Sequence, residues 1–559
     1  MASNLLRDAR QLLRLLDPVL VKRVLEAVRP GPAVALGAAG SLPWLLGRGP
    51  SLGVLSQANA IAEPSTPAIH DRSGTLTWSE LEARSNQLAH GLDELGVAPG
   101  RSIATLLRNG REFVETVFAA QKLGVQIAPL NTWAKPKELR RAVEGTEPVL
   151  VIYDAKHREQ IKESVKKDVG LVAVGDRRRA ARGSTAYEGL LEGRPDSPQP
   201  AFTADRGKPK VIIHTSGTSG KPKAASRGTG LKQVTSFLAM LNVVPYRRAD
   251  VILCPAPLFH SFGLLTLTVG TVLGATLVLP ERFDPEQTLD LMEEHSVTAA
   301  SLVPVMIRRI LALSASKKRD RDLSELRIVL ASGSQMSPEL REGAMDLLGD
   351  VLYDLYGSTE AGWVAIATPD DIREDPKTLG KPVPGVEVAV FDENGEEVPT
   401  GETGVLHVKS DVVFEGYASG EETPGQKGYI SIGDTGFIDE KGRLYVEGRE
   451  DEMVVIGGEN VYPAEIEETI ESLDGVEEVA VVGVPDEEYG EVLAAFVRGR
   501  VDPERVRAAC KDELASFKIP KIVEVVDELP RTSTGKVVKK ELIGLLEERR
   551  KGQDKRRSA

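Results

Sequence analysis

The side chains with the clearest chemical meaning follow a short apolar strand near the middle of the chain. The strand is predicted over residues 211–214 and runs into a loop rich in Gly, Ser, Thr and Lys. Glycine lets backbone amides crowd around an anion, and hydroxyl and ammonium groups add donors that suit a polyphosphate. The loop reads Thr215, Ser216, Gly217, Thr218, Ser219, Gly220, Lys221, Pro222 and Lys223. The sequence therefore predicts a phosphate site at the end of this strand.

The loop is not the P-loop of Walker-type nucleotide-binding proteins. That motif has four residues between its glycines and a Ser or Thr after its lysine. Here two residues separate Gly217 from Gly220, and Pro222 follows Lys221. Because proline cannot continue a helix out of the lysine, the P-loop geometry fails. A bare loop of this composition also suits a flexible turn, so the prediction depends on the preceding strand and the paired lysines.

A second group of polar residues follows a predicted strand at residues 351–354. An acidic side chain just after a strand and a tight glycine turn can reach a bound Mg²⁺, because hard cations on phosphates prefer carboxylate oxygen. The alternative is a Thr-Glu pair that caps a helix. The segment reads Tyr356, Gly357, Ser358, Thr359 and Glu360.

Three further segments place single charged residues beside glycines or small side chains. Asp434 lies within residues 429–436, and a carboxylate can accept from both vicinal hydroxyls of a ribose. Two glycines precede Glu459, which suits a loop that passes close to another molecule, although an ordinary hairpin also carries such glycines. Lys536 ends a Ser/Thr/Gly-rich loop at residues 530–536, where a lysine considered alone is usually solvated.

In their order and spacing, these segments resemble the motifs of the adenylate-forming superfamily. That superfamily includes acyl-CoA synthetases, aryl-CoA ligases, luciferases and the adenylation domains of peptide synthetases. The resemblance covers roughly residues 55–545. It implies an ATP-dependent acid:CoA ligase that uses Mg²⁺, forms an acyl-adenylate and passes the acyl group to coenzyme A.

The resemblance assigns roles to the nucleotide-binding residues. Glu360 matches the magnesium ligand, and Thr359 matches the residue that contacts the α-phosphate. Asp354 and the Ser332–Ser334 segment match positions that line the adenine, and Asp434 would hold the ribose with help from Arg449. The expected ATP- and AMP-binding set is Thr215, Ser216, Gly217, Thr218, Ser219, Gly220, Lys221, Lys223, Gly333, Ser334, Asp354, Tyr356, Gly357, Thr359, Asp434 and Arg449.

The resemblance also implies the catalytic residues, which are Lys536, His260 and Thr359. Lys536 matches the lysine of the adenylation step, where a cation between the attacking carboxylate and the α-phosphate offsets their repulsion. His260 would lie beside the substrate carboxylate. Amino-acid-activating relatives carry an aspartate near this histidine, and Ser261 and Phe262 stand there instead. An amino-acid substrate is therefore disfavoured.

Two more expectations concern movement between the half-reactions. Asp451 falls on the position of the family's hinge, although the hinge reads Arg-Glu-Asp-Glu where an Asp-Asp or Lys-Asp pair is more usual. A mobile small domain would rotate there, removing Lys536 and bringing a second loop to the site for thioester formation. That loop comprises Gly457, Gly458 and Glu459.

The acid substrate is expected to be a medium- or long-chain fatty acid. The uncharged stretch 262–279 contains small residues that could leave room for an acyl chain, and the expected pocket residues are Phe262, Gly263, Leu264 and Gly270. An aryl or small acid is the alternative. Three other activities stay open: loading of a carrier protein, a luciferase-like oxygenase, and adenylate binding without catalysis.

The elements that must position these residues follow an α/β pattern. Short apolar runs alternate with helices, which predicts covered parallel sheets. We expect a large N-terminal domain of layered mixed sheets with helices, plus a small mobile α+β C-terminal domain. The expected divisions are a helical appendage at 1–55, the large adenylation domain at 56–448, a hinge at 449–451, the small domain at 452–545 and a basic tail at 546–559.

Several predicted elements can be checked individually. Thr77 and Glu80 form a capping box before a helix that ends at Gly96. The stretch Phe262–Pro280 is predicted as a buried helix followed by a buried strand rather than a membrane span. Other strands are predicted at 103–107, 149–153, 171–174, 479–484, 493–498 and 522–526, and helices at 113–123, 464–472 and 503–516.

The bulk composition limits the classes of function. Hydrophobic residues make up 41% and charged residues 27%, which is ordinary for a soluble globular protein. A formal net charge of -13 argues against a nucleic-acid binder. Two cysteines without metal-ligand spacing suit a cytoplasmic protein. A homodimer is the default for a soluble enzyme.

The first residues of the chain have their own pattern. Leucines interleave with arginines, as in an amphipathic helix, and no compact apolar core precedes a cleavage site. One interpretation is a helix docked on the large domain. The other is peripheral membrane contact through residues 1–48, where a water-insoluble acid would be found.

Overall fold

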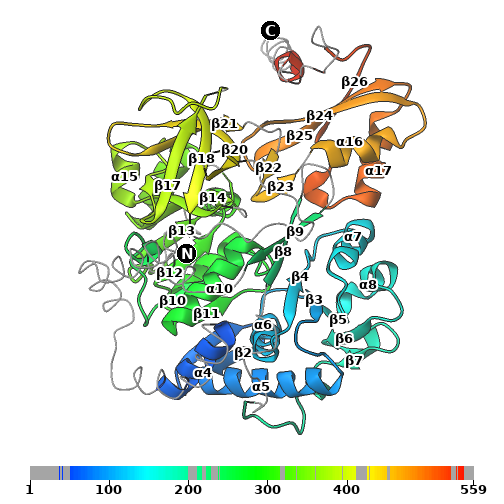
Figure 1. Cartoon of the computed structure of the whole chain (residues 1–559), viewed down its shortest axis with the longest axis vertical. Coiled ribbons are helices and arrows are strands. Elements are labelled where there is room, and N and C mark those ends of the chain that lie inside the picture. The colour runs from blue at the N-terminus through cyan, green and yellow to red at the C-terminus, as the bar shows by residue number, and fades with distance from the viewer. Residues whose placement is uncertain are drawn as a thin grey trace.

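The computed structural model describes most of the 559-residue chain and divides it into two parts. The described backbone forms four sheets, three of them before residue 450 and one after it (Figure 1). The described residues are 37, 41, 51–198, 211–216, 222–227, 237, 239–314, 321–334, 336–358, 361–392, 394–410, 425–426, 428–449, 454–461, 463–530, 537, 539 and 541–546. The expectations for residues 1–48 therefore lie outside the described residues, apart from Gly37 and Ser41.

A seven-stranded sheet carries the strand that precedes the predicted phosphate loop. Its order is β7-β6-β5-β3-β4-β8-β9, parallel except for the last pair. The strands are β3 (Ser102–Leu106), β4 (Gln126–Pro129), β5 (Leu150–Asp154), β6 (Gly170–Val174), β7 (Thr185–Ala186), β8 (Val211–Ser216) and β9 (Pro222–Arg227). Helices α6 (Arg111–Leu123), α7 (Pro136–Thr146) and α8 (Arg158–Ser164) connect or flank them. Both β3 and β5 are buried along their whole length, as continuous apolar strands of a covered parallel sheet should be.

A nine-stranded sheet provides the second layer of the large domain. Its order is β16-β15-β14-β13-β12-β10-β11-β1-β2. The strands are β1 (Pro67–Asp71), β2 (Gly74–Thr77), β10 (Val251–Leu253), β11 (Thr276–Leu279), β12 (Ala299–Leu302), β13 (Ile328–Ala331), β14 (Leu352–Ser358), β15 (Gly362–Ala367) and β16 (Lys381–Pro382). Its helices are α4 (Leu52–Ala62), α5 (Trp78–Glu94), α10 (Ser261–Leu273), α11 (Pro285–Glu294), α12 (Pro304–Leu311), α14 (Pro338–Leu348) and α15 (Pro369–Glu374).

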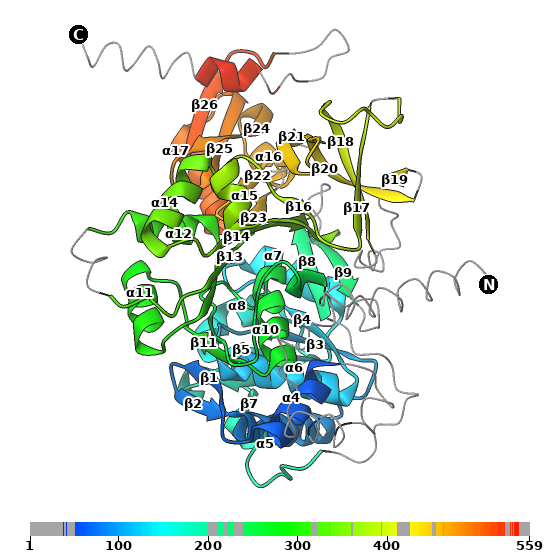
Figure 2. The same ribbon diagram turned by 90° about the vertical axis from the view of Figure 1, so that its left-hand side faces the viewer.

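Two smaller sheets complete the described chain, one in each part (Figure 2). The large domain adds β17 (Val386–Phe391), β18 (Gly404–Ser410), β19 (Gly425–Gln426), β20 (Tyr429–Ile438) and β21 (Leu444–Arg449). The small domain contains β22 (Val454–Ile456), β23 (Glu459–Val461), β24 (Val476–Asp486), β25 (Gly490–Gly499), β26 (Ile522–Val526), α16 (Pro463–Glu471), α17 (Pro503–Glu513) and the 3₁₀ turn η4 (Ser516–Lys518). The expected α/β large domain and small α+β domain are confirmed.

The local predictions agree with the structure except at the ends of some elements: β8, predicted to end at residue 214, continues through Ser216, and α17, predicted to end at residue 516, ends at Glu513. Thr77 and Glu80 form the expected capping box, and residues 262–280 form α10 followed by β11. Among the described residues, no helix is long and apolar enough to cross a membrane. The predicted end of a strand at residue 354 was wrong, because β14 continues through Tyr356 and Gly357. A side chain at Gly357 would stand 2.0 Å from the Gly362 carbonyl oxygen, so the glycine permits close strand pairing rather than a turn.

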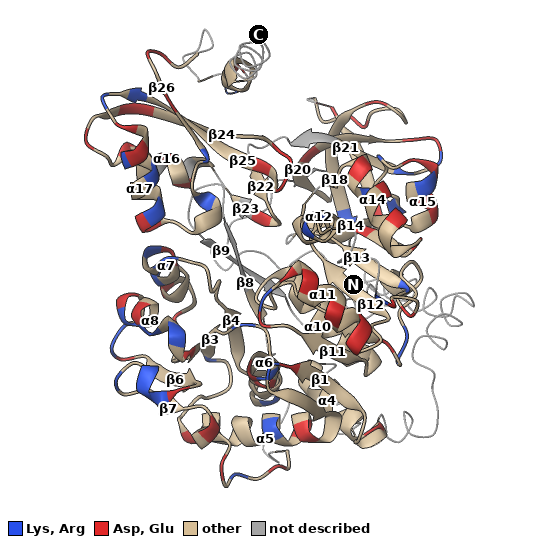
Figure 3. Cartoon of the chain, turned by 180° about the vertical axis from the view of Figure 1, so that it is seen from behind, with Lys and Arg blue, Asp and Glu red and all other residues tan. Residues whose placement is uncertain are grey.

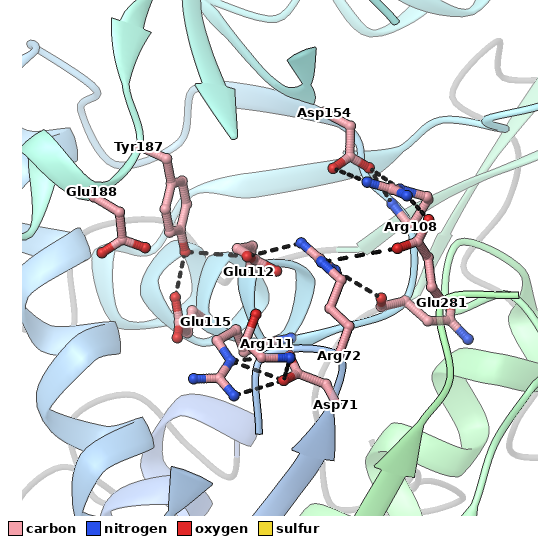
Figure 4. Close-up of polar contacts among 12 residues, drawn as sticks. Asp71, Arg72, Arg108, Arg111, Glu112, Glu115, Asp154, Tyr187, Glu188 and Glu281 are labelled. Atoms are coloured by element: carbon pink, nitrogen blue, oxygen red, sulfur yellow. Dashed lines mark hydrogen bonds and ion pairs between the residues drawn. The ribbon is translucent and has the colours of Figure 1, made fainter. Parts of the chain in front are cut away.

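Ion pairs join the two main sheets of the large domain (Figure 4). Asp71, at the end of β1, receives bonds from the backbone and guanidinium of Arg111 at the start of α6. Arg72 bonds to Glu112 at 3.0 Å, and Arg108 bonds to both Asp154 and Glu281. Because these partners come from both sheets, the network fixes the orientation of one sheet on the other.

Candidate active site

The predicted phosphate loop joins two antiparallel strands at the edge of the seven-stranded sheet. Thr215 pairs with Lys223 and Ser216 with Pro222, so β8 and β9 bracket the five residues between them. Gly217, Thr218, Ser219, Gly220 and Lys221 lie outside the described residues. Strand β23 of the small domain lies next to β8, and the views in Figures 1 and 2 agree on this. The edge of the sheet formed by β8 and β9 therefore lies at the boundary between the two domains.

The second and third motifs meet through one hydrogen bond. The Tyr356 hydroxyl donates to Oδ2 of Asp434, which joins β14 of the nine-stranded sheet to β20 of the neighbouring sheet. The Asp434 side chain is buried, and its backbone pairs with that of Arg449 in β21. The structure thus brings together Tyr356, Asp434 and Arg449, which lie up to 93 positions apart in the sequence.

Asp354 has a partner that the sequence did not indicate. Asp354 is 3% exposed, and its carboxylate accepts a bond from Nη2 of Arg341, a residue of α14. Arg341 also donates to the carbonyl oxygens of Pro376 and Thr378, at 2.7 and 2.6 Å. Burial raises the pKa of Asp354, and the adjacent guanidinium opposes that rise. An adenine contact by Asp354 stays a prediction, and Arg341 would fix the carboxylate for it.

One large cavity connects these residues. Its volume is about 1580 Å³, which exceeds the usual size of a ligand site and leaves room for a nucleotide together with a second substrate. The lining residues from the predicted set are Gly333, Ser334, Asp354, Tyr356, Gly357, Asp434 and Gly458. Besides residues 217–221, four more predicted residues lie outside the described residues: Thr359, Glu360, Asp451 and Lys536.

The turn of the small domain reaches into this cavity. Gly457 and Gly458 have φ values of 59° and 91° and join β22 to β23. Two consecutive residues with positive φ form the two-residue hairpin turn that glycine favours. A side chain at Gly333 would stand 3.6 Å from the Gly458 Cα atom, so the turn packs directly on the large domain. The sequence left open whether these glycines belong to an ordinary hairpin or to a loop that enters the site. The structure shows a hairpin turn whose Gly458 lines the cavity.

Beside this turn, Glu459 approaches the predicted catalytic histidine. The Nε2 atom of His260 lies 2.7 Å from Oε1 of Glu459, and His260 stands at the N-terminus of α10. The rings of Phe259 and Trp133 lie next to His260, with centroids 4.4 and 6.2 Å from the imidazole. Trp133 is 47% exposed. The sequence alone assigns Trp133 no role, because only its exposed position beside these residues indicates one.

A second cavity of about 680 Å³ begins at this cluster. Trp133, Phe259, His260, Gly458 and Glu459 line it, so its walls come from both domains. Its lining combines these aromatic residues with charged ones such as Arg108, Lys156 and Arg309, so it suits a ligand that has both charged and apolar parts. This cavity is thus a candidate channel to the atoms that react.

The predicted acyl pocket is only partly supported by the packing of α10. Phe262 and Leu265 line the large cavity, and Phe262 and Gly263 line the second one. The expectation that Gly270 gives room for a chain was wrong, because a side chain there would stand 2.7 Å from Leu277 of β11. Leu264 is buried in the core of the large domain. Only the first turns of the helix therefore face open space.

Within the described residues, no group of three His, Cys, Asp or Glu side chains could hold a metal ion. The predicted magnesium ligand, Glu360, lies outside those residues. Its carboxylate is the ligand type that Mg²⁺ prefers.

Comparisons with known proteins agree with this arrangement. The family model for the AMP-binding enzyme matches residues 56–418, and that for the AMP-binding enzyme C-terminal domain matches residues 465–536. A putative acyl-CoA ligase, YdaB, from Bacillus subtilis is 32% identical over 84% of this chain and 94% of its own. An indoleacetate-CoA ligase from Aromatoleum aromaticum is 33% identical over 85% of this chain and 94% of its own.

Solved structures show the same architecture. The amide bond synthetase McbA from Marinactinospora thermotolerans superposes with a TM-score of 0.78 at 27% identity, covering 86% of this chain and 97% of its own. The o-succinylbenzoate CoA synthetase of Bacillus subtilis, a double mutant bound with its product analogue, gives a TM-score of 0.76 at 28% identity. It covers 87% of this chain and 98% of its own.

Proposed function

The chain belongs to the AMP-binding enzyme family, in its acyl-CoA ligase branch, and we propose that it joins an apolar carboxylic acid to coenzyme A. It is an AMP-forming acid:CoA ligase. The observation that best supports the proposed site is the meeting of Tyr356, Asp434 and the Gly457–Glu459 turn in one cavity lined by both domains.

In the first step, the carboxylate attacks the α-phosphate of ATP and pyrophosphate leaves. The hairpin between β8 and β9 would hold the triphosphate, and Asp434, fixed by Tyr356, would hold the ribose. Glu360 would hold a Mg²⁺ ion, which would offset phosphate charge. Lys536 would lie between the two anionic reactants, so that positioning and charge neutralisation lower the barrier.

In the second step, the thiol of coenzyme A attacks the acyl-adenylate and AMP leaves. The described arrangement suits this step, because the Gly457–Glu459 turn already lies against Gly333 and His260. The pantetheine arm would reach the reacting carbon through the second cavity, past Trp133. A rotation about Asp451 would exchange this turn for Lys536 in the first step, so that one pocket serves both reactions.

For the acid, we favour a medium-chain fatty acid over a long one. Phe262, Leu265, Leu355 and Trp363 give the large cavity apolar walls. The later turns of α10 are packed in the core, where Leu267 and Leu273 are fully buried. The pocket therefore offers apolar surface over a limited depth, which suits a short or medium acyl chain.

An aryl acid is the second candidate. Two aromatic side chains, Phe262 and Trp363, line the cavity, and flat rings stack well against such surfaces. The relative named as an indoleacetate-CoA ligase acts on an acid of this kind.

A panel of acids tests the proposal. AMP release with and without CoA would be measured for acetate, benzoate, ferulate, indoleacetate, octanoate, decanoate and palmitate. We expect CoA-dependent release, highest with octanoate or decanoate and low with acetate and palmitate. A maximum with benzoate, ferulate or indoleacetate would select the aryl candidate. Absence of CoA-dependent release across the panel would contradict the ligase assignment.

The acceptor and the location need separate tests. Replacing CoA by a holo carrier protein in the same assay would distinguish a carrier-loading enzyme, and light emission with a luciferin would reveal an oxygenase. Flotation of the chain with anionic vesicles, with and without residues 1–48, tests peripheral membrane contact. Sedimentation tests the expected homodimer.

A further inference from the structure

A buried lysine connects the two domains beside the second cavity. Lys518 ends the 3₁₀ turn η4 of the small domain and is 8% exposed. Its Nζ atom donates to Oε1 of Glu138 in the large domain at 2.6 Å and to Oε2 of Glu465 in the small domain at 2.8 Å. Both carboxylates are nearly enclosed, with side chains 11% and 8% exposed.

Lys518, Glu138 and Glu465 form a triad, and the balance of their charges explains why the buried lysine keeps its proton. Burial disfavours a protonated lysine, but the carboxylates of Glu465 and Glu138 together outweigh burial and raise the pKa of Lys518. Lys518 therefore stays charged at neutral pH. A buried cation between two acceptors is well satisfied, whereas removal of one partner leaves an uncompensated buried charge. The hydrogen bonds also occupy the ammonium group, so Lys518 is a poor candidate for binding a phosphate of coenzyme A.

The positions of the two glutamates give the triad a specific role. Glu465 lies on α16, six residues after Glu459 of the turn that enters the site. Glu138 lies in the first turn of α7, five residues after Trp133, and Trp133 lines the second cavity. Fixing α16 to α7 therefore fixes the turn relative to the wall of the cavity.

We infer that Lys518 is a positioning residue for thioester formation, holding the small domain in the orientation that seats the Gly457–Glu459 turn. The inference rests on the proposed function for its chemistry, but not for its geometry. Within the triad, only the bond to Glu138 crosses between the domains; the bond to Glu465 is internal to the small domain. Rotation of the small domain would break the first bond and keep the second. A contact made in one orientation alone shifts the population toward that orientation.

Two further ion pairs across the same boundary are more exposed than the triad. Lys137 pairs with Glu513, but their side chains are 53% and 40% exposed. Arg309 pairs with Glu488 at 2.8 Å, also with both side chains well exposed. Exposed ion pairs contribute little. Figure 3 shows charges of both signs on α7 and α17, the helices on the two sides of this boundary.

The first experiment needs no substrate. Cysteines placed at positions 137 and 513 would be joined by a short bismaleimide, and the rate of crosslinking would report how often the domains adopt the described orientation. The native Cys254 and Cys510 are buried, so they should not compete. In this background, Glu138→Gln should slow crosslinking at least about fivefold. Glu144→Gln, an exposed change on the same helix, should leave the rate unchanged.

The second experiment separates the half-reactions in the otherwise native chain. Glu138→Gln should keep ATP–pyrophosphate exchange near the wild-type rate and slow thioester formation from pre-made acyl-adenylate at least about fivefold. Lys518→Met should likewise keep the exchange and slow thioester formation. Lys518→Arg, which keeps the positive charge, should form the thioester faster than Lys518→Met. A general loss of folding would instead lower both half-reactions together.

The outcomes distinguish this inference from the proposed function. Unchanged crosslinking in Glu138→Gln would overturn the inference, whatever the enzyme does with acids. Equal loss of both half-reactions would also overturn it. If no acid in the panel supports AMP release while crosslinking still responds, the proposed function fails and the positioning role of Lys518 stands. Glu138→Gln leaves the Lys518–Glu465 pair in place, so it provides the test if Lys518→Met does not fold.

Discussion

At the scale of single residues, the bond between Tyr356 and Asp434 is the clearest link between sequence motif and site. The phenol donates to one carboxylate oxygen. A carboxylate offers about four acceptor sites, so it can accept from a ribose as well. Tyr356 would thus orient Asp434 before the nucleotide arrives, which lowers the cost of ordering the site on binding.

Replacing Asp434 tests this role. Asp434→Asn should raise the KM for ATP about tenfold or more, because bonds to a charged acceptor contribute about 1.5–3 kcal/mol. Tyr356→Phe should have a smaller effect in the same direction, since it removes only the orienting bond. Steady-state kinetics at saturating acid and CoA would measure both. Asp392→Asn, which removes a turn carboxylate in the same sheet, is the matched control.

The predicted catalytic lysine is tested by separating the two steps. Lys536→Ala should abolish ATP–pyrophosphate exchange and leave thioester formation from pre-made acyl-adenylate intact, because only the first step joins two anions. Lys511→Ala, which changes an exposed lysine of α17 that lines neither cavity, is the control. Wild-type exchange by Lys536→Ala would show that the assigned role is wrong.

At the scale of elements, the β22–β23 turn shows how local geometry serves the site. Its two glycines have positive φ, and Gly458 faces Val303 and the Gly333 carbonyl oxygen across the domain boundary. A side chain there meets both backbone strain and a close neighbour. A Cβ atom at position 458 would be in ordinary contact with Val303, at 3.5 Å, so a larger side chain is needed to separate the turn from the large domain.

Gly458→Val is expected to reduce thioester formation at least about tenfold while leaving adenylation unchanged, because a valine there would crowd Val303 and the Gly333 carbonyl oxygen only in the orientation that seats the turn, and overpacking costs about 1–3 kcal/mol. Measuring each half-reaction separately would show this. The control is Gly442→Val, whose φ is also positive, at 75° against 91°, but which has no neighbouring atom within 4 Å. Equal effects of the two variants would mean that strain in a turn, rather than contact with the large domain, explains the loss.

Element prediction from sequence succeeded where burial dictates pattern. The capping box at Thr77 and the apolar runs of β3 and β5 are local signals, and they appear as expected. The role of Gly357 was not predictable, because a glycine that permits close pairing of β14 and β15 looks the same in sequence as one in a turn. The prediction for Gly270 was wrong for a similar reason, because the space beside this glycine is occupied by Leu277 of β11.

At the scale of the whole molecule, the sequence motifs indicated which residues lie close together, but not which ion-pair partners keep them in position. The resemblance grouped Asp354, Tyr356 and Asp434, and the structure brings these into one cavity. It did not indicate the partner Arg341 or the triad of Lys518. Long-range ion pairs leave no periodic pattern in either segment, so only the tertiary structure identifies them.

The network between the two main sheets predicts how stability depends on pH. Burial would raise the pKa of Asp71, but the bonds from Arg111 and Ser73 outweigh burial and lower it. A carboxyl group with a lowered pKa stabilises the fold above its unfolded-state pKa of about 3.9, and this stabilisation is lost as pH falls through the folded-state value.

Asp71→Asn should therefore lower the free energy of unfolding by about 3 kcal/mol at neutral pH, as removal of one partner from a buried pair does. The difference from wild type should shrink as the pH falls below about 4. Urea unfolding across this range would measure it. A difference that stays constant down to acid pH would show that the charge of Asp71 is not responsible. Asp176→Asn, at an exposed ion pair, should change little at any pH.

The half-exposed indole of Trp133 beside the histidine gives the molecule an intrinsic optical reporter. Trp78 is buried and lines neither cavity, Trp363 lines the large cavity, and Trp44 lies outside the described residues. Trp133 lines the second cavity beside His260 and the β22–β23 turn. Changes in tryptophan fluorescence on mixing with CoA or ATP should therefore follow domain movement in real time without an added dye. A Trp133→Phe chain, which should lose this signal, would provide the blank.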